Sequence, residues 1–247
     1  MRFRPTLWPT LFTVPALIVL VGLGIWQLER LQWKVALIAE RTARTTAEPI
    51  PLPAAGAALS AAELADLDYR HASATGEFLH DRELLLAART MAGAVGYQVV
   101  TPLRLPNGGV LLINRGWVPD KFKDAALRAE GQVTGMVTID GAIRAPAQQH
   151  WLQPDNDPAR NVWFWADLPA MAAAAGVGDR LVPIFLEAGP AANPGGYPIG
   201  GQSHVNLPND HLQYAITWFS LALALAVIYL VYHRRAGGHG AADGTSE

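Results

Sequence analysis

The chain has 247 residues, a formal net charge of −2, no cysteine, and a hydrophobic share of 51% against 16% charged residues. This composition is too apolar for an ordinary soluble protein, in which about 25% of residues are charged. The charge balance excludes the broad basic surface that nucleic-acid binding requires, and the lack of thiols excludes disulfides, thiolate metal sites, covalent c-type haem attachment and cysteine nucleophiles.

The first predicted element is a membrane span from Trp8 to Leu28, which carries no charged residue. At about 1.5 Å per residue it is long enough to cross a hydrocarbon core of roughly 30 Å. A cleaved secretory signal has a shorter apolar region and a small-residue cleavage site, whereas this segment ends in Trp26-Gln27-Leu28. We therefore predict an uncleaved anchor within residues 1–40, whose helix continues as an interfacial extension to Ile38.

Residues 41–68 are predicted to form a linker and one short helix. Ala, Thr and Pro dominate residues 42–58, a composition typical of a linker. Ser60 and Glu63 have the spacing of a capping box, which predicts a short helix beginning there.

Residues 69–208 are predicted to form a mainly antiparallel β domain, a sandwich or partly open barrel with one or two short helices. The strongest signal is a hairpin from Gly96 to Pro119, in which two β-rich runs flank the turn residues PNGG. Pro102 lacks an amide hydrogen, so its strand is expected to lie at an edge or to carry a bulge. Further strands are predicted on both sides of residues 80–83 and at 132–144, 162–165 and 182–186, with a short helix between Asp167 and Gly176.

The second predicted span lies within residues 209–235, and a disordered tail is expected at 236–247. Its uncharged core runs from Tyr214 to Tyr232, and His233-Arg234-Arg235 follows directly. Positive charge next to a span marks its cytoplasmic end. Because two spans place both termini on one side, both are predicted to be cytoplasmic and the central domain to lie outside.

His211 lies where the second span begins, and a helix that begins near Asn209 would place its imidazole on a face with aromatic and apolar groups. These are Tyr214 or Ala215, Trp218 and Leu221. A neutral imidazole beside such groups can ligate the iron of a flat, apolar macrocycle. The alternative is structural, because polar residues cap helix starts and Tyr and Trp occupy membrane interfaces.

The hairpin supplies a second candidate in Asn114, Arg115 and Trp117. Strand alternation is expected to place Arg115 and Trp117 on one face with the apolar residues Leu111 and Ile113. Arg115 would pair with a carboxylate such as Glu77 or Glu83, contact an aromatic ring, or receive a propionate of a ligand.

Gln27, Glu29 and Arg30 form a third cluster at the outer end of the first span. Interfacial anchoring explains them. The alternative is that they meet His211 and Gln213, which requires the two spans to pack as a pair.

Four segments carry a resemblance: GIWQLERLQWK at 24–34, TGEF at 75–78 followed by ELLLAAR, the hairpin GYQVVTPLRL with LLINRGWVP, and NDHLQYAITWF at 209–219. In this order they resemble the surfeit-locus protein family of cytochrome c oxidase assembly factors. The resemblance implies an integral inner (plasma) membrane protein whose periplasmic domain assists maturation of a haem-copper oxidase. The sequence also lacks the G-x-S-x-G, phosphate-loop and H-E-x-x-H motifs, so we predict no enzymatic activity and no catalytic residues.

The resemblance further implies binding of haem a, with His211 as an axial ligand of the iron and Tyr214, Trp218, Trp26 and Arg30 as candidate pocket residues. The implied partners are the catalytic subunit of the oxidase, other assembly factors and the lipid bilayer. The alternative function is a cofactor-free structural chaperone that stabilises a subunit I assembly intermediate and grips it through an exposed hairpin edge near Pro102. In that function Asn114, Arg115 and Trp117 are structural or partner-contact residues.

Overall fold

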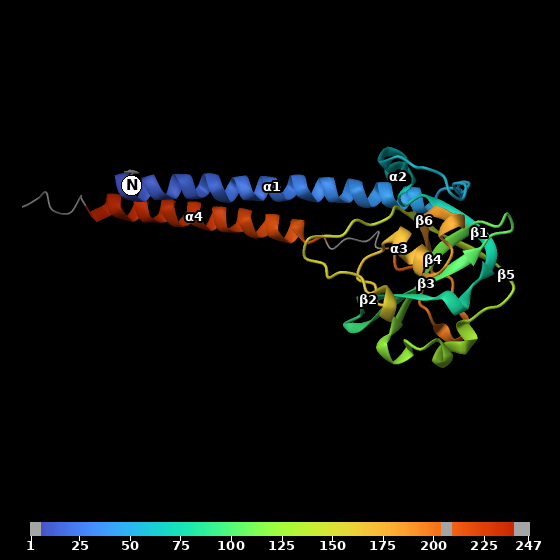
Figure 1. Cartoon of the computed structure of the whole chain (residues 1–247). Coiled ribbons are helices and arrows are strands. Elements are labelled where there is room, and N and C mark those ends of the chain that lie inside the picture. Colours follow the sequence, from blue (N-terminus) through green and yellow to red (C-terminus); the bar gives the residue numbers. More distant parts are fainter. Residues whose placement is uncertain (1–5, 204–208, 240–247) are drawn as a thin grey trace, which may run out of the picture. The chain divides into compact units, whose positions relative to one another are not determined.

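The computed structural model describes residues 6–203 and 209–239, which fall into two compact units (Figure 1). The helical unit contains helix α1 (Leu7–Thr46) as far as Glu40, together with helix α4 (His211–His239). The β unit contains the described residues from Arg41 to 203. Helix α4 continues beyond the predicted end at 235, and residues 240–247 of the predicted tail lie outside the described residues.

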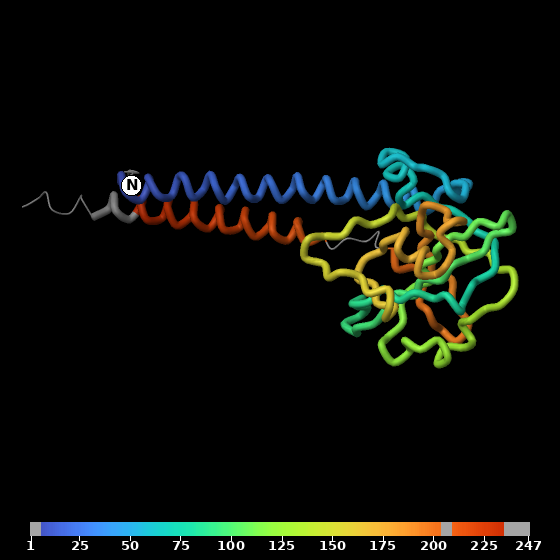
Figure 2. Tube along the Cα trace, in the orientation of Figure 1, coloured from blue at the N-terminus to red at the C-terminus, as the bar shows by residue number. Residues whose placement is uncertain are grey.

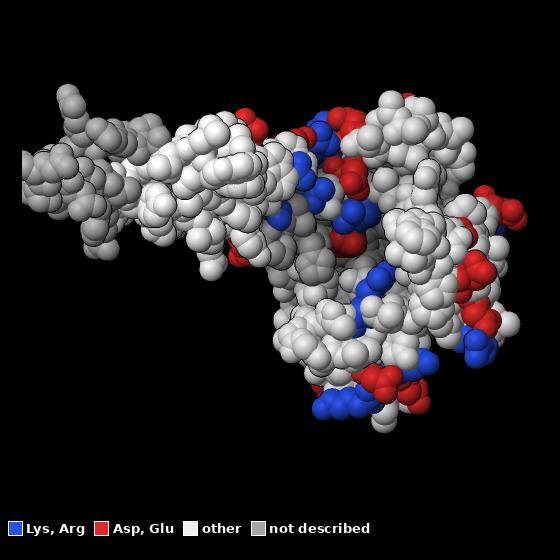
Figure 3. All heavy atoms as spheres, turned by 90° about the vertical axis from the view of Figure 1, so that its left-hand side faces the viewer, with Lys and Arg blue, Asp and Glu red and all other residues white. Residues whose placement is uncertain are grey.

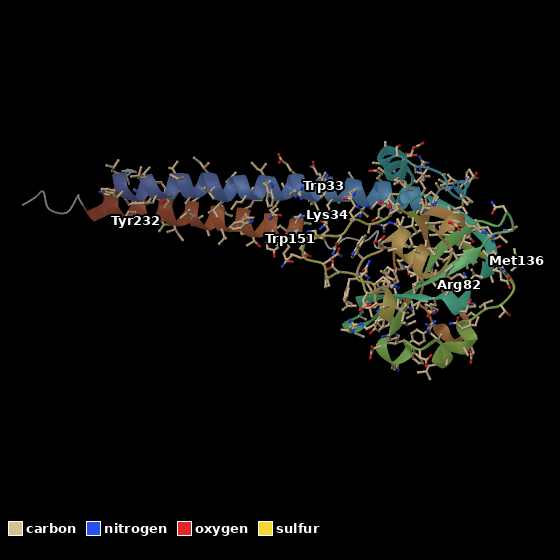
Figure 4. The ribbon with its side chains drawn as sticks, viewed as in Figure 1. Trp33, Lys34, Arg82, Met136, Trp151 and Tyr232 are labelled. Carbon is tan, nitrogen blue, oxygen red and sulfur yellow. The ribbon has the colours of Figure 1, made fainter. Side chains whose placement is uncertain are left out.

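Both helices of the helical unit are long and apolar enough to cross a membrane. Most of their visible surface is uncharged and appears white in Figure 3. Trp33 on α1 and Tyr232 on α4 (Figure 4) are 52% and 53% exposed. Exposed aromatic side chains on such helices are typical of the belts that lie at membrane interfaces.

The end of α1 corrects the predicted linker, because the helix continues to Thr46 and residues 42–46 are helical. The hydroxyls of Thr45 and Thr46 donate hydrogen bonds to backbone carbonyls of the preceding turn. Arg44 donates to the carbonyl of Asp66, at the end of helix α2 (Ala61–Leu67), 3.0 Å away. Side-chain contacts that the composition of the segment did not reveal therefore hold this last turn in place.

The two long helices pack side by side in antiparallel directions (Figures 1 and 2). Gly24 is buried, and a Cβ atom built on it would lie 2.6 Å from the ring of Phe219. Further along the pair, the Thr10 hydroxyl lies 2.6 Å from the Tyr229 hydroxyl. Small residues and interhelical hydrogen bonds are what hold helices together in lipid, where the hydrophobic effect does not act between them.

The β unit contains six strands that form one closed sheet. Their bounds are β1 (His71–Phe78), β2 (Leu84–Met91), β3 (Ala94–Arg104), β4 (Val110–Pro119), β5 (Met136–Arg144) and β6 (Leu181–Ala188). Their order is β1-β5-β6-β4-β3-β2, and β1 also pairs with β3, which closes a barrel. Only the β4–β6 pair among these strands is parallel. The predicted fold class is confirmed, and the barrel proves to be closed.

Apolar residues pack on both sides of this sheet. Leu111, Ile113 and Leu186 belong to a cluster to which β1, β3, β4, β5 and β6 all contribute, so this cluster fills the barrel. Leu112 and Phe185 belong to a second cluster, which packs against helix α3 (Leu168–Ala174) on the outer face. Strands buried on both faces explain why β4 is a nearly continuous apolar run.

Residues 162–165 do not form the predicted strand and make only isolated bridges, of Val162 to Asp157 and of Trp163 to Leu86. The Oδ1 atom of Asn156 accepts hydrogen bonds from the amides of residues 164 and 165. These amides are therefore not available to a neighbouring strand. Trp163 itself is fully buried against the outer cluster.

The expectation that Pro102 lies at a sheet edge is wrong, because β3 has neighbours on both sides and Pro102 is buried. On one side the partner strand changes at this position: β2 pairs with β3 as far as Val100, and β1 pairs with it from Leu103. The missing amide hydrogen falls where the ladder changes partner, so no ladder bond is lost there. The β3–β4 register does shift between Val99 and Val100, but the additional residue of that bulge lies on β4 and not on the strand of Pro102.

The packing of the helical unit makes Gly24 and Gly22 a matched pair for a test. Gly24→Leu is expected to separate α1 from α4, because its side chain would overlap the ring of Phe219. Gly22→Leu should leave the pair intact, because nothing lies within 4 Å of a Cβ at that position. The measurement is crosslinking by a short bismaleimide between cysteines placed at Thr10 and Tyr229 of the otherwise cysteine-free chain. Equal crosslinking in both variants would contradict the packing.

Candidate functional site

The imidazole of His211 lies at the first residue of α4 and contacts α1. Its Nδ1 atom is 2.7 Å from Oε1 of Gln27. An amide oxygen only accepts hydrogen bonds, so Nδ1 carries the ring proton and donates it. The other ring nitrogen, Nε2, keeps its lone pair, and no residue in the described part of the chain bonds to it.

The face of α4 that packs against α1 is narrower than the sequence suggested. Ala215 and Ala222 are 1% and 6% exposed, so they follow His211 along the contact face. Tyr214 and Leu221 are 56% and 48% exposed and therefore lie away from it. The sequence left open whether Tyr214 or Ala215 follows His211 on this face, and the exposures show that it is Ala215.

Trp218 lies on the same face, seven residues after His211, a spacing of two helical turns. Its indole nitrogen is buried and has no hydrogen-bond partner among the described residues. An unpaired N–H group in a buried position is costly, since it has lost its water without gaining an acceptor. His211 and Trp218 thus each present one polar atom without a partner.

Trp26 and Arg30, the remaining candidates in the helical unit, are not brought to His211 by any contact in the described residues. Trp26 is 49% exposed, and the Arg30 guanidinium carbon lies 4.4 Å from the ring centroid of Trp33. This cation–π contact suits an interfacial anchor. Of the cluster at the outer end of the first span, Gln27 is the residue that meets His211.

In the β unit, Arg115 occupies a β-bulge of β4. Val100 pairs with Asn114 and Val99 with Gly116, so Arg115 is the additional residue of the bulged strand. The guanidinium carbon of Arg115 lies 4.7 Å from the ring centroid of Phe78, which belongs to the cluster inside the barrel. Its side chain therefore points inward.

The bulge overturns the expectation that Arg115 and Trp117 share a face. Trp117 pairs with Gln98, which lies on the same face of β3 as Val100, the partner of Asn114. The extra residue thus returns Trp117 to the face of Asn114, and the Trp117 indole donates to the carbonyl of Arg89 at 3.0 Å. Strand alternation alone does not reveal this change, because a bulge reverses the parity after it.

Arg115 also lacks the carboxylate that was expected for it. Glu77 pairs with Arg104, and Glu83 pairs with Arg128. Arg115 instead donates to the Gly131 carbonyl, while its Nη1 atom is buried without a partner among the described residues. Burial lowers the pKa of Arg115 to about 10. The ring contact that was the other structural expectation is made with Phe78.

His80 is close enough to Arg115 to sense its charge, and Gln132 follows the residue to which Arg115 donates; no pattern in the sequence pointed to either. His80 donates from Nε2 to the carbonyl of Val133 at 2.8 Å, and its ring centroid is 5.4 Å from that of Phe78. The Nδ1 atom of His80 and both polar atoms of the Gln132 side chain are buried without partners in the described part of the chain. Burial is the main cause that lowers the pKa of His80, and the charge of Arg115 acts in the same direction.

Comparison with known proteins places the chain in a family. The family model described as "SURF1 family" matches residues 14–223, a range that includes both Gln27 and His211. Surfeit locus protein 1 of Rattus norvegicus is 40% identical over 237 residues, covering 90% of this chain and 74% of the rat protein. Surfeit locus protein 1 of Homo sapiens is 39% identical over 224 residues, covering 84% of this chain and 72% of the human protein.

The chain belongs to the SURF1 family. A SURF1-like protein of Monosiga brevicollis is similar along almost its whole length, with 39% identity over 244 residues that cover 94% of this chain and 89% of that protein. The SURF1 match extends over both described units, since it begins within α1 and ends within α4. The resemblance found in the four sequence segments is therefore confirmed.

The lowered pKa of His80 predicts how the stability of this SURF1 protein depends on pH. The unfolded chain takes up the His80 proton near pH 6.5, while the folded protein resists it, so the free energy of unfolding falls as the pH drops below about 6.5. His80→Gln, which stays neutral, should flatten this part of the melting-temperature curve. The exposed His150→Gln is the control and should not change it. An unchanged slope in His80→Gln would show that other groups cause the loss of stability.

Proposed function

We propose that this protein is an assembly factor for a haem-copper cytochrome c oxidase and that it holds haem a through His211. The observation that carries the haem role is the hydrogen bond from His211 to Gln27. A histidine that ligates a metal almost always donates its other ring N–H to an acceptor, which fixes its tautomer and orientation. Gln27 supplies that acceptor, and Nε2 is then the atom that would bind iron.

The surroundings of His211 support a ligand that is largely apolar. It lies at one end of an apolar helix pair, and the Trp218 ring and the small residue Ala215 follow it on the same face. Haem a, when bound, would supply the redox iron that the oxidase needs. The residues of this chain would hold it by one axial bond and by contact with apolar side chains, and lipid would cover its hydrocarbon tail.

A delivery role sets limits on the affinity of the site. A ligand that must be released during assembly cannot be held by every available bond, because slow dissociation would stop transfer. His233 of the helical unit is fully buried, and its ring nitrogens lie 3.1 Å from the Thr6 hydroxyl and 2.8 Å from the Tyr229 carbonyl. His233 is thus engaged in helix pairing, and His211 is the histidine with a ring nitrogen without a partner among those of this unit whose side chains the structure describes.

Membership of the SURF1 family supports oxidase assembly as the wider role, and the two candidate membrane spans support a membrane location. The proposal includes an inner membrane location with both termini in the cytoplasm and the β unit in the periplasm. The role is non-catalytic: the chain holds and releases a cofactor and changes no bond in it. Assembly partners would be the catalytic subunit of the oxidase and other assembly factors.

Haem a content of the purified full chain, made in cells that synthesise haem a, tests the proposal. His211→Ala is expected to lose bound haem a. Gln27→Leu, which keeps the imidazole but removes its acceptor, is expected to weaken binding by about 10-fold or more. His150→Ala serves as the control, because this histidine is exposed and belongs to the β unit. Absorbance of the extracted haem gives the measurement.

A parallel pull-down of the oxidase subunit from the same membranes separates the two parts of the proposal. Loss of haem a with retention of the subunit in His211→Ala supports a carrier that docks independently of its cofactor. Full haem a content in His211→Ala removes this histidine from the site. Retention of the subunit in that case would favour the cofactor-free chaperone. Such a chaperone would have to grip the subunit elsewhere than at Pro102, which is buried and not at an exposed edge.

A further inference from the structure

The β unit has a cavity of about 240 Å³ on the outer face of its sheet, which the proposed function does not use. Its floor comes from neighbouring strands: Val100 of β3 pairs with Asn114 of β4, and Asn114 pairs with Glu187 of β6. Residues after β5 and before α3, including Ala145 and Trp165, complete the wall. Pockets for drug-sized ligands are about 300–1,000 Å³, so this one suits a smaller molecule.

The apolar part of the cavity is formed by Leu86, Val100 and Phe185, all members of the outer core cluster. These side chains are packed against α3 and its neighbours, so the floor is preformed. An apolar floor with polar groups at one side is the usual arrangement of a small-molecule site.

The charged groups of the cavity are unequally paired. Arg144 lies 2.9 Å from Asp68 and 3.5 Å from Glu187, and Glu187 also accepts a bond of 2.7 Å from the Ser203 hydroxyl. Arg89, by contrast, has no carboxylate within ion-pair distance among the described residues. Its guanidinium donates a long hydrogen bond of 3.4 Å to the carbonyl of residue 164. The charge of Glu187 acts on Arg89, but in the described part of the chain Arg89 makes no direct ion pair.

Trp165 adds a second donor without a partner. Its indole nitrogen is buried and unbonded in the described part of the chain, and Trp165 directly follows the residue that Arg89 contacts. The backbone of Arg89 is fixed in turn by the Trp117 indole. A guanidinium with one long hydrogen bond and an indole N–H without an acceptor are a combination that an anionic oxygen satisfies.

We propose that this cavity binds a small monocarboxylate, whose oxygens accept hydrogen bonds from Arg89 and from the Trp165 indole while its carbon body lies against Leu86, Val100 and Phe185. The two oxygens of a carboxylate can accept from both donors, and Glu187 in the lining would repel a doubly charged phosphate more strongly than a singly charged carboxylate. Arg144 is already paired with Asp68 and Glu187, so it attracts the ligand less strongly than Arg89 does. Burial, which lowers the pKa of Arg89, is the cost that such a ligand would offset.

The test uses the full chain and sodium benzoate as the probe, with benzamide and benzylamine as neutral and cationic analogues of the same shape. Benzoate is expected to bind with one saturable site, and both analogues should bind at least about tenfold more weakly because they lack the anionic oxygens. Calorimetric titration measures the affinity. Absence of saturable benzoate binding, or equal binding of benzamide, would overturn the proposal.

Variants locate the site. Arg89→Gln should weaken benzoate binding by about tenfold or more, Arg89→Lys should recover part of it, and Trp165→Phe should weaken it while keeping the ring. Arg160→Gln is the matched control, because that arginine is 79% exposed and lies outside the cavity. Benzoate affinity that is unchanged in both Arg89→Gln and Trp165→Phe would place binding elsewhere and overturn the assignment.

Two further measurements separate this proposal from other outcomes. Binding of benzoate should be the same in His211→Ala, because the cavity belongs to the β unit. Failure of the haem proposal would therefore not contradict this proposal. A short peptide with a free carboxyl terminus should bind no more tightly than benzoate. Much tighter binding of the peptide, lost on amidation and in Arg89→Gln, would overturn the small-molecule assignment in favour of a polypeptide end.

Discussion

The antiparallel pairing of α1 and α4 is the constraint on which the candidate cofactor site depends, because His211 is oriented by a residue of the other helix. In lipid the apolar surfaces of two helices gain nothing from leaving their solvent, so close approach and hydrogen bonds must hold them. Gly24 allows the approach at Phe219, and the Thr10 and Tyr229 hydroxyls meet further along. The hydrogen bond that His211 donates to Gln27 belongs to this same set of contacts. The residue that would bind iron is thus positioned by the interactions that pair the helices.

The β unit differs in that it buries charged side chains as well as apolar ones. Arg128 and Glu83 form an ion pair in which both side chains are at least nine-tenths buried. Arg115 lies in the same region with a ring contact and a carbonyl but no carboxylate in the described residues. A buried charge without a counter-ion reduces stability, and the fall in the pKa of Arg115 expresses that cost. His80 is affected by the same positive field, which couples the stability of this region to mild acid.

Local signals in the sequence were enough to predict most of the elements, and long-range contacts explain the exceptions. Periodicity and capping residues revealed the elements that depend on patterns within a few turns or strands. These are the β3–β4 hairpin, the capped helices α2 and α3, and both long helices. The last turn of α1 depends on Arg44 reaching Asp66, and residues 162–165 are diverted by Asn156. No local pattern contains these contacts.

In the candidate sites, too, the sequence indicated single residues, whereas the contacts between them depend on the fold. His211 and Gln27 were both noticed, since each is polar beside an apolar helix, but their contact required the two helices to pair in one register. Arg115 was noticed for its type, whereas its neighbours His80 and Gln132 come from segments with no signal of their own. Arg89 was missed because its significance lies in its place in a cavity without a direct ion pair among the described residues, a property that only the folded arrangement reveals.

The segment from Asn114 to Trp117 explains how one short run of sequence serves two sides of the barrel. Asn114 lines the outer cavity, Arg115 points into the core, and Trp117 returns to the outer face to hold the backbone of Arg89. The bulge requires an unusual residue between them: Gly116 has φ of 120°, and a Cβ there would lie 2.0 Å from the carbonyl oxygen of Ile199. Only glycine allows that backbone conformation together with that close approach. The conformation of one residue without a side chain thus decides where its three neighbours act.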